Sequence, residues 1–350
     1  MCMNRVFFGL LLFVPLTLAL YATGASAVLL FFLAGVAIVP LAKYIGEATE
    51  ELTLYTSTAM GGFLNATFGN ATEIIIGIAA LNAGLIEVIK ASITGSILGD
   101  LLFVLGASIF FGGLKRERQH FNSTAAKASY SSMLLAVTAL VVPAIFLITA
   151  PSVGDLTLDR VSIIASVLLI VAYLASLLFS LRTHRHLYLA ETARFEPRWS
   201  KTKSILVLAC ATVALAGMSE ILVGSIEPIV QSLGWTQLFI GVIFIAIIGN
   251  AAEHVSAVTV ALRDKMDLSI QITTGSAAQI AMFVMPALVL ISFLFPTHMH
   301  LVFNSFELVC MVFAVFVVGS IIEDGESTWL EGLQLLVAYA IIAIAFFFHP

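Results

Sequence analysis

The chain has 350 residues, of which 60% are hydrophobic and 11% charged, with a mean hydropathy of +1.08 and a formal net charge of −5. A soluble domain carries about 25% charged residues, so this composition excludes a protein whose surface lies in water. It favours a multi-pass protein in a lipid bilayer, with no nucleic acid as a partner. The cysteines Cys2, Cys210 and Cys310 are too scattered for a disulfide framework or a metal motif.

The N-terminal segment 1–26 contains an apolar stretch at 6–22 that follows Arg5. The small residues ATGASA after it resemble the cleavage site of a secretory signal peptide. We interpret the segment instead as a first transmembrane helix, because apolar sequence resumes at once from Val28.

Ten further apolar stretches follow, each of a length suited to a membrane-spanning helix of about 20 residues. We expect them at 27–45, 54–81, 86–113, 129–149, 161–181, 204–225, 236–262, 268–295, 301–321 and 328–348. The predicted fold class is therefore an all-α polytopic membrane protein with about eleven transmembrane helices.

The basic residues indicate the orientation, because cytoplasmic loops of membrane proteins are enriched in Lys and Arg. With a cytoplasmic N-terminus, only Lys90 and Arg160 of the 16 basic residues fall outside. The other 14 (16 − 2) fall inside: Arg5, Lys43, Lys115, Arg116, Arg118, Lys127, Arg182, Arg185, Arg194, Arg198, Lys201, Lys203, Arg263 and Lys265. We expect a protein of the cell membrane whose C-terminus is extracellular, because the number of spans is odd.

The sequence after a basic linker at 182–203 repeats the sequence before it at a constant offset of 180. The corresponding pairs are Glu47 and Glu227, Gly69 and Gly249, Asn70 and Asn250, Glu73 and Glu253, Thr94 and Thr274, Gly95 and Gly275, and Ser96 and Ser276. Five spans separate the matching helices, so the two copies cross the membrane in opposite senses. The pattern predicts two inverted five-helix repeats, 27–181 and 204–350, as in many secondary transporters.

Each repeat carries the same two motifs inside apolar sequence. In Gly-Asn-x-x-Glu, the spacing places all three polar or small residues on one face of a helix. A glycine there lets another backbone approach, or leaves its own carbonyl free as a ligand. In Thr-Gly-Ser, on the next span, we expect a helix break that exposes carbonyl oxygens toward a cavity. Gln279 lies three residues after Ser276, on the same face.

These motifs predict a cation site near the membrane midplane whose charged ligands are Glu73 and Glu253. Its candidate residues are Glu73, Glu253, Asn70, Asn250, Ser96, Ser276, Gln279, Gly69 and Gly249. All offer oxygen, which suits Ca²⁺ better than Zn²⁺ or Cu⁺, so Ca²⁺ is expected as a transported substrate rather than a cofactor. Desolvation disfavours a bare carboxylate, so each Glu should be protonated or cation-bound. One such Glu could be structural, but a pair related by an inverted repeat favours function.

Other titratable residues have two open interpretations. His254, which has Ile74 as its counterpart, either modulates the neighbouring proton site or is a core histidine. Asp100 is a candidate for a proton path. The acidic cluster Glu47, Glu50 and Glu51 is either a solvated helix end or a funnel that concentrates cations at an entrance.

The two pairs of motifs resemble the α-repeats of the cation/proton exchangers in the Ca²⁺/cation antiporter superfamily, of the bacterial type found in Bacillus. GNATEIIIGIAAL with ITGSILGDLL resembles the first repeat, and GNAAEHVSAVTVAL with TTGSAAQIAM the second. The resemblance implies that Glu73 and Glu253 bind Ca²⁺ and protons alternately, with the Asn, Ser and Gln residues as polar lining. It also implies a homotrimer.

The hypothesis is therefore alternating-access Ca²⁺/H⁺ exchange by a transporter, not an enzyme. Na⁺-coupled members carry further acidic or polar residues on the Thr-Gly-Ser helices, whereas Gln279 and Gly99 occupy those positions here. Related eukaryotic exchangers have an acidic linker, whereas 182–203 is basic. The alternatives are a Na⁺/Ca²⁺ exchanger, a cation channel, and an intramembrane metalloenzyme, which would need a metal motif that is missing.

Overall fold

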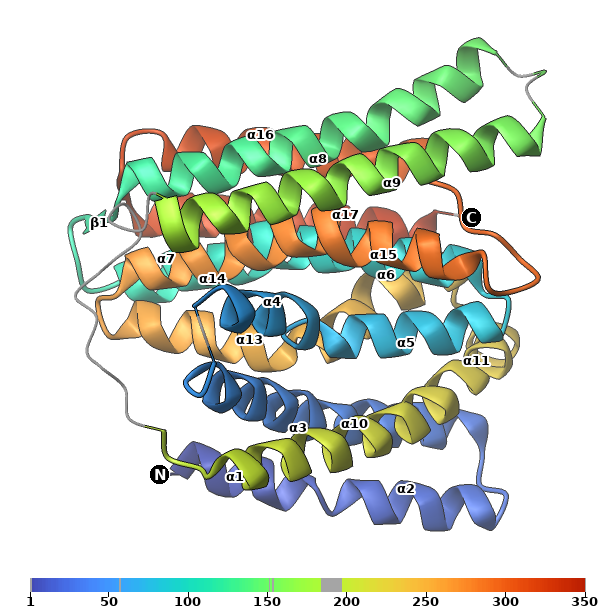
Figure 1. The fold of residues 1–350 in the computed structure, drawn as a ribbon. Helices are drawn as coiled ribbons and strands as arrows, with labels where there is room; N and C mark the ends of the chain where they lie inside the picture. Colours follow the sequence, from blue (N-terminus) through green and yellow to red (C-terminus); the bar gives the residue numbers. More distant parts are fainter. Residues whose placement is uncertain (1, 57, 151, 153, 184–196, 350) are drawn as a thin grey trace.

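The computed structural model describes residues 2–56, 58–150, 152, 154–183 and 197–349, which are almost entirely helical (Figure 1). In chain order the elements are α1 (Cys2–Leu10), α2 (Phe13–Ala22), α3 (Ala27–Thr53), α4 (Thr58–Phe68), α5 (Ala71–Asn82), α6 (Ile86–Leu98), the π-helical turn η1 (Gly99–Val104), α7 (Leu105–Gly113), β1 (Gln119–His120), α8 (Ser123–Thr149), α9 (Asp155–Leu178), the π-helical turn η2 (Phe179–Thr183), α10 (Lys201–Gly224), α11 (Ile226–Leu233), α12 (Gln237–Phe239), the π-helical turn η4 (Ile240–Ile245), α13 (Ala246–Leu262), α14 (Met266–Gln279), the π-helical turn η5 (Ile280–Val284), α15 (Met285–Ser292), α16 (Ser305–Ile322), β2 (Glu326–Ser327) and α17 (Trp329–Phe348).

The helical segments lie side by side, and the N- and C-termini are at opposite ends of the bundle (Figure 1). Within the described residues, nine segments are long and apolar enough to cross a membrane. Two shorter apolar helices, Ala71–Asn82 and Ser305–Ile321, lie at the remaining two predicted spans, 54–81 and 301–321. The predicted all-α polytopic fold is confirmed.

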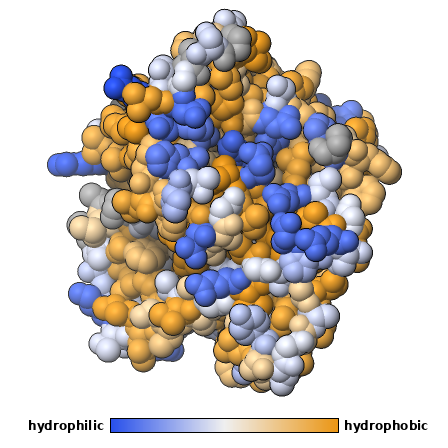
Figure 2. Space-filling model, turned by 90° about the vertical axis from the view of Figure 1, so that its right-hand side faces the viewer, coloured by the Kyte–Doolittle hydropathy of each residue, from blue (hydrophilic) through white to orange (hydrophobic). Residues whose placement is uncertain are grey.

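The connections between helices gather at the two ends of the bundle. We call the end that holds the N-terminus the linker side; it carries 54–56, 114–122, 197–200, 263–265 and 323–328. The opposite end, the far side, carries 83–85, 234–236 and 293–304, and its polar residues are spread across the end face in Figure 2. Arg185, Arg194 and most of the predicted linker 182–203 lie outside the described residues.

Burial divides the helices into inner and outer ones. The segments Ile86–Gly113 and Met266–Ser292, which carry the Thr-Gly-Ser motifs, are the most buried of the candidate spans. On the outer helices large apolar side chains point outward, for example Val213 and Phe313, which are 74% and 63% exposed. Such a surface is stable in contact with lipid chains rather than water. The motifs thus lie at the centre of a bundle with an apolar outer surface.

Some predicted boundaries differ from the structure. The span predicted at 27–45 continues to Thr53, so the acidic cluster is part of α3. The span predicted at 54–81 is two helices, because the chain leaves helical geometry at Gly69–Asn70. The helix break predicted at each Thr-Gly-Ser motif is wrong, since α6 and α14 run through both motifs.

The glycine of the first Thr-Gly-Ser motif serves close packing instead. A methyl group on Gly95 would lie 2.1 Å from the carbonyl oxygen of Val242, so the backbones of α6 and η4 are in direct contact. Both motifs are followed by a π-helical turn, at Gly99–Val104 and Ile280–Val284. These turns begin at nearly equivalent positions under the 180-residue offset, and π-helical turns often mark functional sites.

Helices α7 and α17 are also packed through glycines, and this contact makes a test of the fold. A methyl group on Gly332 would lie 2.3 Å from the backbone nitrogen of Phe110. We expect Gly332→Val to lower the free energy of unfolding by about 1–3 kcal/mol, as overpacking does, measured as a lower thermal midpoint in detergent. Gly217→Val is the matched control, because a methyl group there meets nothing within 4 Å. Equal midpoints for the two variants would contradict the packing.

Candidate cation site

Glu73 lies in the first turn of α5, directly after the break at Gly69–Asn70. The start of a helix carries a partial positive charge from its free N–H groups, which favours a carboxylate there. A methyl group on Gly249 would lie 3.1 Å from Oε1 of Glu73. The second repeat therefore supplies a glycine where the carboxylate of the first repeat needs room.

Glu253 lies within α13, and unpaired oxygen atoms surround it. Four buried side-chain oxygens in this region have no hydrogen-bond partner: Oε2 of Glu253, Oγ of Ser276, Oδ1 of Asn70 and Oδ2 of Asp100. Leaving a buried polar atom unpaired costs about 1–3 kcal/mol, and more for a charged group. A cation or protons at this place would satisfy these oxygens.

The two motif asparagines connect the repeats in a reciprocal way. Nδ2 of Asn70 donates to Oε1 of Gln279 at 2.7 Å, and Nδ2 of Asn250 donates to Oγ of Ser96 at 2.8 Å. Asn250 also donates to the carbonyl oxygen of Ala246 at 3.0 Å. Because each amide donates through nitrogen, its oxygen remains available as a neutral ligand.

Asp100 and His254 form a second polar group beside the site. Nε2 of His254 lies 3.3 Å from Oδ1 of Asp100, and both side chains are buried. Asp100, at the start of the π-helical turn η1, also lies beside Ser276. The structure therefore brings two residues proposed for proton transfer into contact with each other and with the lining of the site.

A cavity of about 260 Å³ leads to Glu253 from the linker side. Its lining residues are Glu50, Asn65, Gly69, Glu253, Gln271, Ile272, Gly275, Ser276 and Gln279. A methyl group on Gly275 would meet nothing within 4 Å, whereas its counterpart Gly95 is packed against Val242. The structure is open on the linker side of the site and closed by backbone contact on the far side.

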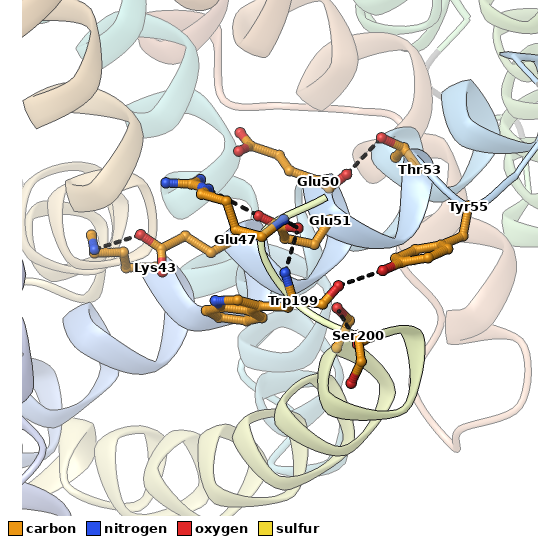
Figure 3. Close-up of polar contacts among 10 residues, drawn as sticks. Lys43, Glu47, Glu50, Glu51, Thr53, Tyr55, Trp199 and Ser200 are labelled. Carbon is orange, nitrogen blue, oxygen red and sulfur yellow. Dashed lines mark hydrogen bonds and ion pairs between the residues drawn. The ribbon is translucent and has the colours of Figure 1, made fainter. Parts of the chain in front are cut away.

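The predicted entrance cluster separates into two parts. Glu50 lines this cavity and also a neighbouring one of about 330 Å³, which Glu47 lines as well. Glu47 accepts a hydrogen bond from Lys43 at 2.7 Å. Glu51 lines neither cavity; it is bonded to Arg198 and Trp199 (Figure 3).

Sequence reasoning missed some polar residues of this region. Asn65 and Gln271 line the cavity, and their positions one to two turns before the motif residues were the available signal. Glu307 is fully buried, and its Oε1 accepts a hydrogen bond from Thr94 at 3.0 Å. Its Oε2 accepts from the backbone of Asn304, so Glu307 caps α16. In the first Thr-Gly-Ser motif, Thr94 is thus bonded to a helix-capping glutamate, whereas Ser96 is bonded to the site residue Asn250.

The donor set fits an oxygen-preferring ion rather than a transition metal. Across the described part of the chain, no three or more His, Cys, Asp and Glu side chains are arranged to hold a metal ion. The two carboxylates would be completed by amide and hydroxyl oxygens, as Ca²⁺ accepts. The inner helices with their buried oxygens define a helical membrane transport protein.

Residues 26–182 and 203–348 both match the family described as "Sodium/calcium exchanger protein", and the chain belongs to this family. It is 47% identical over 365 residues to a Ca(2+)/H(+) antiporter of Synechocystis, covering 99% of this chain and 98% of the relative. It is 45% identical over 352 residues to the Ca(2+)/H(+) antiporter ChaA of Bacillus subtilis, covering 99% of both. The solved structure of native YfkE is similar with a TM-score of 0.86 and 42% identity, over 98% of this chain and 100% of that one.

The one-sided cavity can be tested with a pair of cysteine variants. We expect Ser276→Cys to react from the linker side with a membrane-impermeant thiol reagent, because Ser276 lines the cavity. Ser96→Cys, its counterpart, should react far more slowly, because Ser96 does not line this cavity and its Oγ is bonded to Asn250. Both variants are made without the native cysteines and followed by mass spectrometry. Faster labelling of Ser96→Cys would contradict the observed opening.

Proposed function

We propose that this protein is a Ca²⁺/H⁺ antiporter that exports Ca²⁺ in exchange for protons. The names of its relatives in Synechocystis and Bacillus subtilis support this activity. The observation that carries the proposal for the site is the set of buried, unpaired oxygens around Glu253 at the end of the cavity. Ca²⁺ takes 6–8 oxygen ligands and is the ion that such a set suits.

In this proposal, Glu73 and Glu253 bind either Ca²⁺ or protons. Ca²⁺ enters from the linker side past Glu50 and is bound by the two carboxylates together with neutral oxygens of Asn70 and Ser276. Protons neutralise the same carboxylates, so both ligands cannot be held at once. This competition couples the two fluxes, because the binding of one ligand requires the release of the other.

The unequal repeats support a proposal for alternating access. The helix of the first repeat is broken at Gly69–Asn70, whereas the equivalent helix of the second repeat is continuous from α12 to α13. Exchanging the two conformations between the repeats would move the break to Gly249–Asn250. It would also free Gly95 from Val242 and close Gly275 against α4. The site would then open on the far side.

The orientation and assembly are part of the same proposal. We place the linker side in the cytoplasm and the far side outside the cell, with repeats at 27–181 and 204–350. The two family matches, at 26–182 and 203–348, support these repeat boundaries. The homotrimer stays a prediction from the resemblance, and the mass of the purified protein in detergent tests it.

Charge-neutralising variants test the shared site. We expect Glu73→Gln and Glu253→Gln each to abolish proton-driven Ca²⁺ uptake into inverted vesicles, because an amide can neither release a proton nor supply the negative charge that balances Ca²⁺. Glu117→Gln is the matched control, since Glu117 is an exposed residue of the loop 114–122 and lines neither cavity. Transport by either site variant at the rate of this control would contradict the shared site.

The counter-ion can be tested separately. We expect a proton gradient to drive Ca²⁺ flux and a Na⁺ gradient alone to drive none, because Gln279 donates no charge and its counterpart Gly99 has no side chain. Flux in proteoliposomes with each gradient in turn makes the measurement. Flux driven by Na⁺ would establish the Na⁺/Ca²⁺ exchanger instead, and steady electrical conductance without either gradient would establish a channel.

A further inference from the structure

Glu51 is a buried carboxylate that the proposed transport mechanism does not use. Its side chain is 5% exposed, and it accepts three hydrogen bonds from Arg198 and Trp199, near the C-terminal end of the linker (Figure 3). Its Oε2 accepts from the backbone N–H of Arg198 at 2.8 Å and of Trp199 at 3.1 Å, and its Oε1 accepts from Nε of Arg198 at 3.1 Å. Such charge-assisted bonds compensate the cost of burying the carboxylate.

Two further contacts hold the same segment. The hydroxyl of Tyr55 donates to the carbonyl oxygen of Trp199 at 2.5 Å, and Nζ of Lys203 lies 4.6 Å from the centre of the Trp199 ring. We call the group of Glu51, Tyr55, Arg198 and Trp199 the α3–linker clamp. The backbone N–H groups of Arg198 and Trp199 are thus bonded to Glu51 near the end of α3. The carbonyl group of Trp199 is bonded to Tyr55, just after that helix.

The clamp lies at a corner that borders the cavity. Helix α3 ends at Thr53 and α4 begins at Thr58, so Tyr55 is in the turn between them. Glu50 from α3, Asn65 from α4 and Gly69 directly after α4 all line the cavity that leads to Glu253. A movement of this corner would therefore change the mouth of the cavity.

Glu50 and Glu51 are adjacent in the sequence but face different parts of the structure. Neighbouring residues of a helix point about 100° apart, and in Figure 3 the carboxylate of Glu51, not that of Glu50, is bonded to Trp199. Glu50 faces the cavities, whereas Glu51 faces Arg198 and Trp199. Because both are on one helical turn, fixing Glu51 also holds the backbone from which the Glu50 side chain extends.

We propose that Glu51 is a positioning residue that clamps the linker end to α3 and thereby holds Glu50 at the mouth of the cation cavity. Glu51 does not contact the cation itself. The inference rests on the proposed Ca²⁺/H⁺ exchange and on an entrance role for Glu50. It assigns to residues 198–199 a part in capture of Ca²⁺ from the linker side.

The test compares KM for Ca²⁺ and maximal rate in proteoliposomes. We expect Glu51→Gln to raise KM by roughly three- to tenfold with little change in maximal rate, because capture is weakened while the site is intact. In Glu51→Gln the ion pair with Arg198 is lost, and the amide nitrogen, if it faces the two backbone N–H groups, cannot accept from them. Arg198→Ala should also raise KM for Ca²⁺, and Arg198→Lys should raise KM less than Arg198→Ala does. Glu117→Gln, at an exposed residue that lines neither cavity, is the control with unchanged KM.

A double variant separates positioning from an independent effect. If Glu51 acts through Glu50, the variant with both Glu50→Gln and Glu51→Gln should have the KM of Glu50→Gln alone. If KM of the double variant rises by the product of the two single-variant factors, the inference is overturned. Unchanged KM in both Glu51→Gln and Arg198→Ala would also overturn it. Should Glu51→Gln fail to fold, judged by gel filtration and thermal midpoint, the same cycle with Arg198→Ala decides.

The outcome for Glu50→Gln distinguishes this inference from the proposed function. An unchanged KM in Glu50→Gln would overturn the entrance role and the clamp with it, while proton-driven flux of the unmodified protein would still support the exchange. Absence of that flux in the unmodified protein would instead overturn the proposed function.

Discussion

A carboxylate in a low-dielectric interior is stable only when a proton, a cation or several hydrogen-bond donors balance its charge. Glu253 meets this requirement poorly from the protein alone, since its Oε2 has no donor and Asn70 and Ser276 also leave oxygens unpaired. By contrast, Glu51 and Glu307 are buried with donors that satisfy both of their oxygens. Glu51 and Glu307 are thus balanced by the protein itself, whereas Glu253 has an oxygen left for a proton or a cation.

The two repeats are alike in sequence but different in conformation, and the proposed transport of ions needs such a difference. A site that must exchange ions with both sides of a membrane cannot be open to both at once. In the structure, Gly95 lies against the backbone of Val242 while Gly275 faces the cavity, although the two glycines are equivalent positions. Glycine allows either arrangement because it adds no side chain to the contact. Equivalent residues can then exchange roles between two states.

The access path and the linker end are connected through the last turns of α3. Glu47 and Glu50 line the cavities, and Glu51, one residue further, is bound by Arg198 and Trp199. The linker is basic, and it is joined to α3 here by backbone bonds and by an ion pair between the buried Glu51 and the exposed Arg198 rather than through an acidic segment. The turn between α3 and α4 is thereby held by residues 198–199, which are far from it in the sequence.

Composition, periodicity and the 180-residue offset were enough to predict the helical membrane fold and the pairing of Gly-Asn-x-x-Glu with Thr-Gly-Ser, because hydrocarbon tolerates few polar groups and those present stand out. The same reasoning failed at the Thr-Gly-Ser motifs, which stay helical, and grouped Glu51 with Glu50. Which oxygens are paired, which of two equivalent glycines is packed, and which way adjacent glutamates point depend on contacts between segments far apart in the chain. Only tertiary packing decides those contacts, because equivalent positions in the two repeats have the same local sequence and yet differ in their neighbours.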